Sequence, residues 1–286
     1  MPQDKKKAIE LYQKAADMGN QNAMTNLALC YNDGDGVPQD KQKAIELYQR
    51  ASEMGNTEAM VKLAVCDDKG DGVPQDKQKA IELYQRAADL GDTNAMANLA
   101  VCYDEGDGVA QDKQKAFELY QKAAEMGYTK GVFNLALHYD KGDGVPQDQQ
   151  KAVELYQRAA DMGHANAMFN LALCYDKGYG VAQDKKKAIE LYQKAADLGN
   201  TDAMVKLGLC YENGDCVPQD KQKAVELLQR AADIRNRNVV IQLKRQDKGR
   251  RENNTYTKQT LEAFTKWTEY RDTDTDGCRV VCWIHL

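Results

Sequence analysis

Apolar residues between positions 23 and 55 follow the i, i+3, i+4, i+7 spacing of amphipathic helices, in two separate stretches. The first stretch contains Met24, Leu27, Ala28 and Tyr31. The second contains Ala44, Leu47, Tyr48 and Ala51. This spacing predicts two helices, each with one apolar face. Because isolated helices of this length are marginal in water, we expect packing to supply their stability.

The residues around the two stretches are those that interrupt or end a helix. Gly34 and Gly36 break the apolar pattern, and Pro38 opposes its continuation. Asp40 stands where an N-cap side chain would accept the free amides of the second helix. Gly55 follows the second stretch and can take the left-handed conformation that ends many helices. We therefore predict a helix, a turn, a second helix and another turn.

The same arrangement recurs every 36 residues. A Val-Pro/Ala-Gln-Asp sequence begins at Val37, Val73, Val109, Val145, Val181 and Val217. A fixed period in this range is typical of solenoids, in which each unit must stack on its neighbours to bury its apolar face. Since such an array grows in one dimension, we interpret the 286 residues as one continuous array.

The recurring residues resemble those of a known repeat family. In the first complete unit they are Leu27-Ala28-x-x-Tyr31-x-x-Gly34-x-Gly36-Val37-x-x-Asp40-x-x-Lys43-Ala44-x-x-x-Tyr48-x-x-Ala51-x-x-x-Gly55. This pattern resembles the Sel-1-like repeat, a relative of the tetratricopeptide repeat. The resemblance implies an all-α fold, a right-handed superhelical solenoid of antiparallel helix pairs. It also implies, for most members, a role in binding other proteins and assembling complexes.

We divide the chain into three parts. Residues 1–22 are a partial repeat, the second helix of a truncated unit, and residues 23–238 are six repeats. Residues 239–286 are predicted to be a degenerate repeat or cap with a partly disordered tail. Within them, residues 239–243 either begin one more first helix or form the cap, and residues 260–270 form a short amphipathic helix.

Some units depart from the repeat. Asp67 stands where the other units carry a tyrosine, which predicts a poorly packed spot or an entry point for water. Cys216 replaces the second loop glycine, Leu228 replaces the tyrosine of the second helix, and Arg235 replaces the terminal glycine. The repeat therefore decays toward its C-terminal end.

Charge and hydropathy narrow the classes of partner. The formal net charge is -5, and an acidic array repels phosphate backbones, so nucleic acid is disfavoured as a partner. Residues 235–251 alone form a local basic patch. No apolar run is long enough to cross a bilayer, and residues 1–5 lack the apolar stretch of a secretory signal. We expect a soluble, cytoplasmic protein.

Most of the cysteines share one repeat position, where His138 fills the remaining slot. These cysteines are Cys30, Cys66, Cys102, Cys174 and Cys210. Equivalent helices of stacked units lie about 9–10 Å apart, whereas a disulfide needs Cα atoms within about 7 Å. Ligands one unit apart cannot converge on a zinc ion either. We interpret the cysteines as small apolar residues beside the first helix.

Two motifs near the C-terminus fall short of metal sites. Asp272, Asp274, Asp276 and Gly277 match the opening of a calcium loop, but the twelfth position is Trp283 instead of glutamate. Further along are three soft ligands without a fourth, Cys278, Cys282 and His285. We therefore predict no metal and no cofactor.

Catalytic residues are scarce, and we predict a non-catalytic protein. The one serine, Ser52, occupies a position that is alanine in other units. The histidines that could act as general bases are His138, His164 and His285. The family-linked alternative is a β-lactam or cell-wall hydrolase of the cysteine-rich, disulfide-stapled subfamily. Where that subfamily has cysteines, this chain has residues such as Ser52 and Met60.

The face of the first helix opposite its packing stripe is the candidate binding surface. In tetratricopeptide arrays this face lines a concave groove, and an asparagine there is among the residues that hold a bound peptide. The matching residues are Asn26, Lys62, Asn98, Asn134, Asn170 and Lys206. Asparagine both donates and accepts hydrogen bonds, which suits an extended peptide backbone, while lysine suits a carboxylate.

An apolar patch is expected beside this row. Phe133 and Phe169 occupy one position in consecutive units, and Lys130 precedes Phe133 by one helical turn. Such a patch suits the anchor side chain of a partner. We therefore predict an interaction scaffold or adaptor for a partner protein or peptide. The alternatives are a regulatory repeat segment of a larger signalling protein and, through apolar chain ends, end-to-end self-association.

Overall fold

The structure is a computed structural model that describes residues 3–249, with side-chain surroundings described for residues 4–237. These residues form helices and, within the described part of the chain, no strand. The first helices of the units, termed A helices, are α2 (Gln21–Asp33), α4 (Thr57–Lys69), α6 (Thr93–Glu105), α8 (Thr129–Lys141), α10 (Ala165–Lys177) and α12 (Thr201–Asn213). The second helices, termed B helices, are α1 (Gln3–Asp17), α3 (Lys41–Glu53), α5 (Lys77–Asp89), α7 (Lys113–Glu125), α9 (Gln149–Asp161), α11 (Lys185–Asp197) and α13 (Lys221–Gly249).

The predicted capping residues set the helix boundaries. Asp40 has an extended backbone, and its side chain accepts a hydrogen bond from the backbone amide of Lys43 at 3.0 Å. This satisfies one of the amides that a helix start leaves free. Gly34 ends α2 in the left-handed conformation, with φ of 71°. In later units aspartate again caps the start of the B helix and a left-handed glycine again ends the A helix, which confirms the helix and turn order expected from the sequence.

The second loop glycine permits a close approach between units. Gly144 has φ of 67°, and a Cβ atom there would lie 2.3 Å from the carbonyl oxygen of Lys113 at the start of α7. A side chain at this position therefore meets both an unfavourable φ and a backbone clash. Cys216 occupies the equivalent position in the last loop with φ of 62°.

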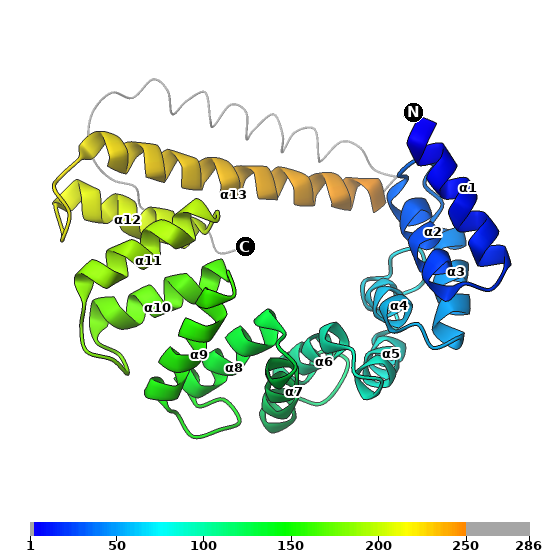
Figure 1. Ribbon diagram of the computed structural model, residues 1–286, viewed down its shortest axis with the longest axis horizontal. Helices are drawn as coiled ribbons and strands as arrows, with labels where there is room; N and C mark the ends of the chain where they lie inside the picture. The colour runs from blue at the N-terminus through cyan, green and yellow to red at the C-terminus, as the bar shows by residue number, and fades with distance from the viewer. Residues whose placement is uncertain (1–2, 250–286) are drawn as a thin grey trace. The chain divides into compact units, whose positions relative to one another are not determined.

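The helices stack in chain order as an all-α solenoid. The A helices from α2 to α10 each pack against the B helix of their own unit, and those from α2 to α12 each pack against the B helix of the preceding unit (Figure 1). Some consecutive A helices are also in contact: α4 contacts α6, and α6 contacts α8. The fully buried side chains lie in these contacts and include Leu27, Tyr48, Leu99 and Tyr156. Stability comes from burial between neighbouring units, as expected for helices of 13 residues.

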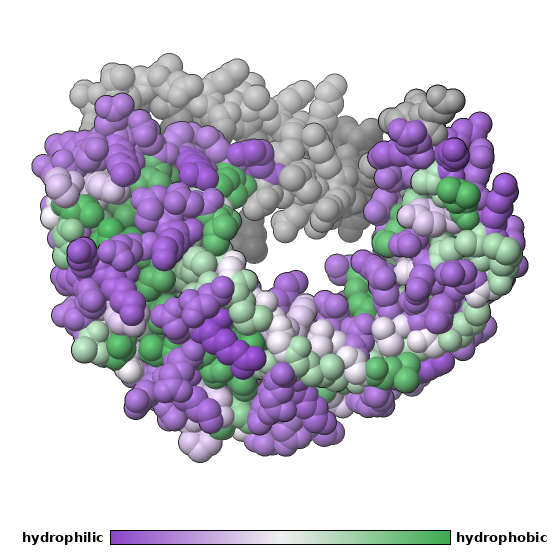
Figure 2. All heavy atoms as spheres, viewed as in Figure 1, coloured by the Kyte–Doolittle hydropathy of each residue, from purple (hydrophilic) through white to green (hydrophobic). Residues whose placement is uncertain are grey.

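Polar side chains cover much of the stack (Figure 2). Several lysines at the starts of B helices form ion pairs with an aspartate in the next loop, namely Lys5 with Asp35, Lys41 with Asp71 and Lys77 with Asp107. Each pair joins consecutive units. Because these side chains are partly exposed, we assign each pair no more than about 1 kcal/mol of stability.

The last helix differs from the other B helices. Residues up to Leu227 belong to one compact unit, and the remainder of α13 belongs to a second. Helix α13 continues through residues 239–243, so no new helix begins there. Gly199 ends the equivalent turn in the preceding unit with φ of 90°, whereas Arg235 has no such preference for the left-handed region. The segment 260–270 lies outside the described residues.

Candidate functional site

The predicted binding residues lie at one turn of successive A helices. Asn26, Lys62, Asn98, Asn134 and Asn170 are partly exposed, and Lys206 is exposed. They come from α2, α4, α6, α8, α10 and α12. Since they occupy the same position of consecutive units, and α6 contacts both α4 and α8, these residues form a row that crosses the units. This row is called the A-helix row below.

Two asparagines of the row are also bonded within the stack. Asn134 forms a hydrogen bond with the hydroxyl of Tyr120 on α7, and Asn170 forms one with Tyr156 on α9. The Tyr156 hydroxyl also donates to Oδ2 of Asp140 on α8 at 3.2 Å. Burial raises the pKa of both tyrosines well above the usual value, so their hydroxyls are protonated donors at neutral pH.

An acidic position accompanies the row. It directly follows the last aromatic position of each A helix and holds Asn32, Asp68, Asp104, Asp140, Asp176 and Glu212. Asp140, Tyr156 and Asn170 therefore connect three successive helices, α8, α9 and α10. Sequence reasoning missed this position, although five of its six members are acidic. The sequence signal that could have identified this position is its recurrence every 36 residues, the same signal that identified the asparagines.

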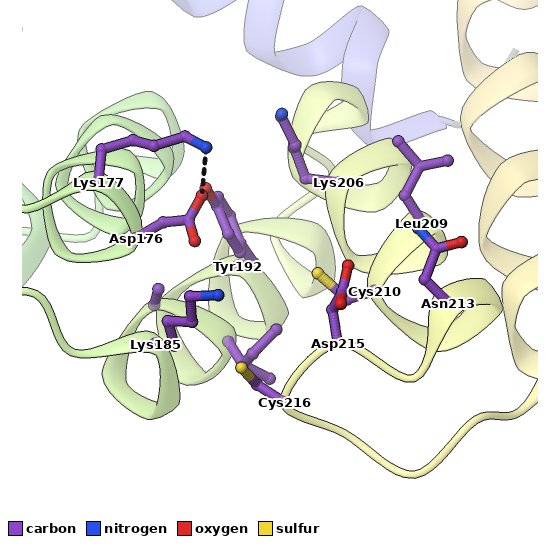
Figure 3. A pocket seen from close by; sticks show the side chains of 12 residues that line it. Asp176, Lys177, Lys185, Tyr192, Lys206, Leu209, Cys210, Asn213, Asp215 and Cys216 are labelled. Atoms are coloured by element: carbon purple, nitrogen blue, oxygen red, sulfur yellow. Dashed lines mark ion pairs between the residues drawn. The ribbon is translucent and has the colours of Figure 1, made fainter.

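Two clefts lie at equivalent places in the stack, 72 residues apart. The larger, called the α10–α12 cleft, has a volume of about 270 Å³ and is lined by α10, α11, α12 and the loop after α12 (Figure 3). The smaller has about 60 Å³ and is lined by α6, α7, α8 and the following loop. Lys206 of the A-helix row lines the first, and Asn134 lines the second.

His138 occupies part of the smaller cleft. This side chain is 4 % exposed, and its Nδ1 lies 2.7 Å from the carbonyl oxygen of Asp143. Its Nε2 lies 3.4 Å from Oδ1 of Asp104, which also binds Lys113 at 2.8 Å. Cys210 holds the equivalent position in the α10–α12 cleft. The smaller thiol leaves more of that cleft open.

The predicted aromatic patch is partly taken up by packing. The Phe133 ring lies 4.5 Å from the ring of His164 and 6.1 Å from that of Tyr156. The Phe169 ring lies 5.8 Å from the ring of Tyr192. Both phenylalanines remain partly exposed, and Lys130 is exposed. Burial, and then the charge of Lys130, lowers the pKa of His164, which places the lysine near this cluster.

The cysteine ladder consists of free thiols. Cys66 and Cys174 are buried, and burial raises the pKa of each thiol to about 11. At neutral pH they are therefore protonated and poor ligands for a metal ion. Within residues 4–237, no group of three or more metal-binding side chains gathers. The calcium-like motif at residues 272–277 and the Cys278, Cys282 and His285 group lie outside the described residues.

The histidines within the described residues have structural contacts. His138 bonds the loop carbonyl, and Nδ1 of His164 accepts a hydrogen bond from the backbone amide of Ala167 at 3.2 Å, which caps α10. Ser52 is buried in α3. None of the helices described from residue 3 to 249 is both long and apolar enough to cross a membrane.

Comparison with known proteins agrees with the repeat pattern. The Sel1 repeat profile matches residues 1–20, 21–56, 57–92, 93–128, 129–164, 165–200 and 201–234. A Sel1 repeat protein from Oxalobacter formigenes is 26% identical with a TM-score of 0.71, and the match covers 78% of this chain and 96% of that one. No curated protein sequence matches this chain.

A second solved structure is a protective antigen present in uropathogenic Escherichia coli strains that displays an SLR fold. It is 30% identical with a TM-score of 0.69, and the match covers 91% of this chain and 56% of the antigen chain. This chain thus spans little more than half of that relative. Because the repeat profile matches residues 1–234 without a gap, the chain belongs to the Sel1 repeat family, whose members commonly mediate interactions between proteins.

Proposed function

We propose that this chain is a non-catalytic scaffold or adaptor that binds a partner protein or peptide along the A-helix row. The observation that supports the proposal is the row itself. Its polar position recurs once per unit and holds a partly exposed asparagine in four of the six units and lysine in the other two, as a partner that crosses several units would require. An amide has four hydrogen-bonding positions, so the bond of Asn134 to Tyr120 leaves others for a ligand.

The surroundings of the row suit an extended peptide. Phe133 and Phe169 offer partly exposed rings one unit apart, and Lys130 adds a charge beside them. Binding energy commonly concentrates on a few aromatic and charged anchors, with polar groups around them. In this arrangement the amides fix the peptide backbone and the rings hold an apolar side chain.

The test compares two triple variants with the wild type in affinity capture from native lysate. Asn98, Asn134 and Asn170 are replaced by alanine in one and by lysine in the other. Lysine occupies the same position in α4 and α12, so the stack accepts it. Alanine removes the bond to the buried tyrosine, and we expect a loss of about 1 kcal/mol of stability at each such bond. Melting must therefore be measured beside binding.

The matched control changes the same units on their B helices. Gln85, Gln121 and Gln157 bond the acidic residue four positions later, and we expect their triple alanine variant to retain every partner. A partner retained by wild type and control, and lost by both asparagine variants, would support the proposal. If the asparagine variants capture the same proteins as wild type while remaining folded, the A-helix row is not the binding surface.

A further inference from the structure

The α10–α12 cleft contains a buried hydroxyl without a partner. Tyr192 is 2 % exposed, and its hydroxyl oxygen makes no hydrogen bond with any residue that the structure describes. The equivalent Tyr156 bonds Asp140 and Asn170, and Tyr120 bonds Asn134. In this cleft the asparagine position holds Lys206, and the Tyr192 hydroxyl forms no hydrogen bond with Asp176, the counterpart of Asp140.

The same cleft gathers lysines that lack acidic partners. Lys177 lies 3.6 Å from Asp176, but neither Lys185 nor Lys206 forms an ion pair with any described residue. Lysines equivalent to Lys185 pair with a loop aspartate in other units, as Lys41 does with Asp71 and Lys77 does with Asp107. Figure 3 shows the side chains of Lys185 and Lys206 among those that line this cleft.

The charge balance of the cleft suits one small anion. Its lining contains three lysines and two aspartates, Asp176 and Asp215, which leaves one net positive charge. Lysine ammonium groups and a tyrosine hydroxyl can all donate to a carboxylate, and hydrogen bonds with a charged partner are the stronger kind. The two aspartates would repel a second negative charge on the same ligand.

The equivalent cleft between α6 and α8 lacks these features. There Lys113 is bound by Asp104 at 2.8 Å, Tyr120 has Asn134 as its partner, and His138 fills space that Cys210 leaves open. The smaller cleft has a volume of only about 60 Å³, whereas about 270 Å³ can hold a side chain. The two clefts therefore differ in charge, hydrogen bonding and size at the same repeat position.

We propose that the α10–α12 cleft binds the carboxylate of a glutamate or aspartate side chain of a partner peptide, with Lys185, Lys206 and the Tyr192 hydroxyl as its donors. This inference rests on the proposed function, because Lys206 belongs to the A-helix row. The acidic side chain fixes the position of the peptide along the row. Affinity for such a peptide falls as ionic strength rises, because salt screens the exposed lysine charges.

The first experiment uses two pools of acetylated and amidated decapeptides with random flanks, one with a central glutamate and one with a central glutamine. A third pool has the central glutamine and a free C-terminal carboxylate. Retention on immobilised protein is measured for wild type and for the Lys185→Met/Lys206→Asn variant. The control is Lys186→Met, which removes one exposed lysine charge from the same helix, α11, at a residue outside both the cleft lining and the A-helix row.

We expect wild type and Lys186→Met to prefer the glutamate pool over the glutamine pool by roughly tenfold, and the double variant to lose that preference. Equal retention of the two pools would overturn the inference, as would an unchanged preference in the double variant. Retention of the third pool alone would overturn it too, because the carboxylate would then be a chain terminus. If wild type retains all pools equally and the Asn98/Asn134/Asn170 variants retain none, the A-helix row binds peptides without a contribution from this cleft. The proposed function then stands, and the inference about the cleft fails. If wild type retains no pool, both proposals fail.

Tyr192→Phe separates binding from stability. Removing an unpartnered buried hydroxyl should leave the melting temperature unchanged or raise it, while preference for the glutamate pool falls several-fold. Tyr156→Phe is the matched control, since that hydroxyl bonds Asp140 and lies outside the cleft lining. We expect this variant to lose stability and keep the preference. If Tyr192→Phe prefers the glutamate pool as strongly as wild type does, the Tyr192 hydroxyl is not a donor to the carboxylate.

Discussion

The ammonium of Lys79 lies 3.2 Å from Oδ1 of Asp67, which is 1 % exposed. In other units the equivalent lysine lies over a tyrosine ring, as Lys43 does over Tyr31 at 4.4 Å from the ring centroid and Lys187 over Tyr175 at 4.2 Å. The lysine therefore keeps its place, and an ion pair replaces a contact with an aromatic ring. The second carboxylate oxygen of Asp67 has no hydrogen-bond partner among the described residues.

Asp67→Tyr should stabilise the protein. The substitution removes a buried carboxylate that is only partly paired and restores the contact between lysine and aromatic ring. We expect a gain of about 1 kcal/mol in the free energy of unfolding, measured with urea. Tyr103→Asp makes the opposite change in the next unit and should destabilise by a similar amount or more. A less stable Asp67→Tyr protein would show that the tyrosine no longer fits this unit.

The same carboxylate gives stability a dependence on pH. Burial raises the pKa of Asp67 above its ordinary value of 3.8, and the bond to Lys79 opposes that rise. Between the unfolded and the folded pKa, the native state binds more protons than the unfolded state. Raising the pH through this window therefore lowers the free energy of unfolding.

Asp67→Asn removes this titration while keeping the shape of the side chain. The stability of wild type relative to Asp67→Asn should fall as the pH rises through the window that begins near 3.8. Urea titrations of both proteins at a series of pH values measure the difference. Lys79→Met should extend the window upward, since the opposing charge is lost. A difference that grows with pH would mean that the folded pKa lies below the unfolded one.

The helix pairs and their caps were predictable because each depends on residues close together in sequence. Asp40, Gly34 and the apolar stripe around Leu27 act within one unit, and the period repeats them. The partners of Asn134 and Asn170 were not predictable in this way. They depend on tyrosines 14 residues earlier, on the B helix of the preceding unit.

The α10–α12 cleft could not be predicted from the sequence pattern either. Lys206 was identified as a candidate, but its importance depends on Tyr192, Lys185 and Cys210, which lie on separate elements. The continuation of α13 through residues 239–243 has a similar cause. Loss of glycine at Arg235 was visible in the sequence, yet whether a helix turns or continues there depends on packing of the whole segment.

Two glycines with positive φ should respond differently to alanine. Gly163 has φ of 85° and nothing within 4 Å of an added Cβ, so alanine there meets only the unfavourable backbone conformation, at about 1–2 kcal/mol. At Gly144 the added Cβ would also lie 2.3 Å from the carbonyl oxygen of Lys113. We expect Gly144→Ala to cost clearly more than Gly163→Ala in urea unfolding. Equal losses would show that the loop moves away from α7 at little cost.

Cys216→Gly should stabilise the end of the array. The cysteine adopts φ of 62°, a region that costs a residue with a Cβ atom about 1–2 kcal/mol and costs glycine little. Its thiol is exposed, so the substitution removes little buried surface. We expect a gain of about 1 kcal/mol, less than the full backbone cost because glycine also gains freedom in the unfolded chain.

Hydrogen exchange of the backbone amides in α11 and α12 shows whether Cys216→Gly stabilises the end of the array or the whole protein. Protection should increase in α12, which the loop follows, and in α11, which lines the same cleft as Cys216, and remain unchanged in α2 to α4. Cys66→Gly is a contrasting change at a buried cysteine inside α4, where glycine removes packing and has a lower helix propensity than cysteine, and it should destabilise. If Cys216→Gly lowers stability, contacts of the Cys216 side chain outweigh the strain of its backbone.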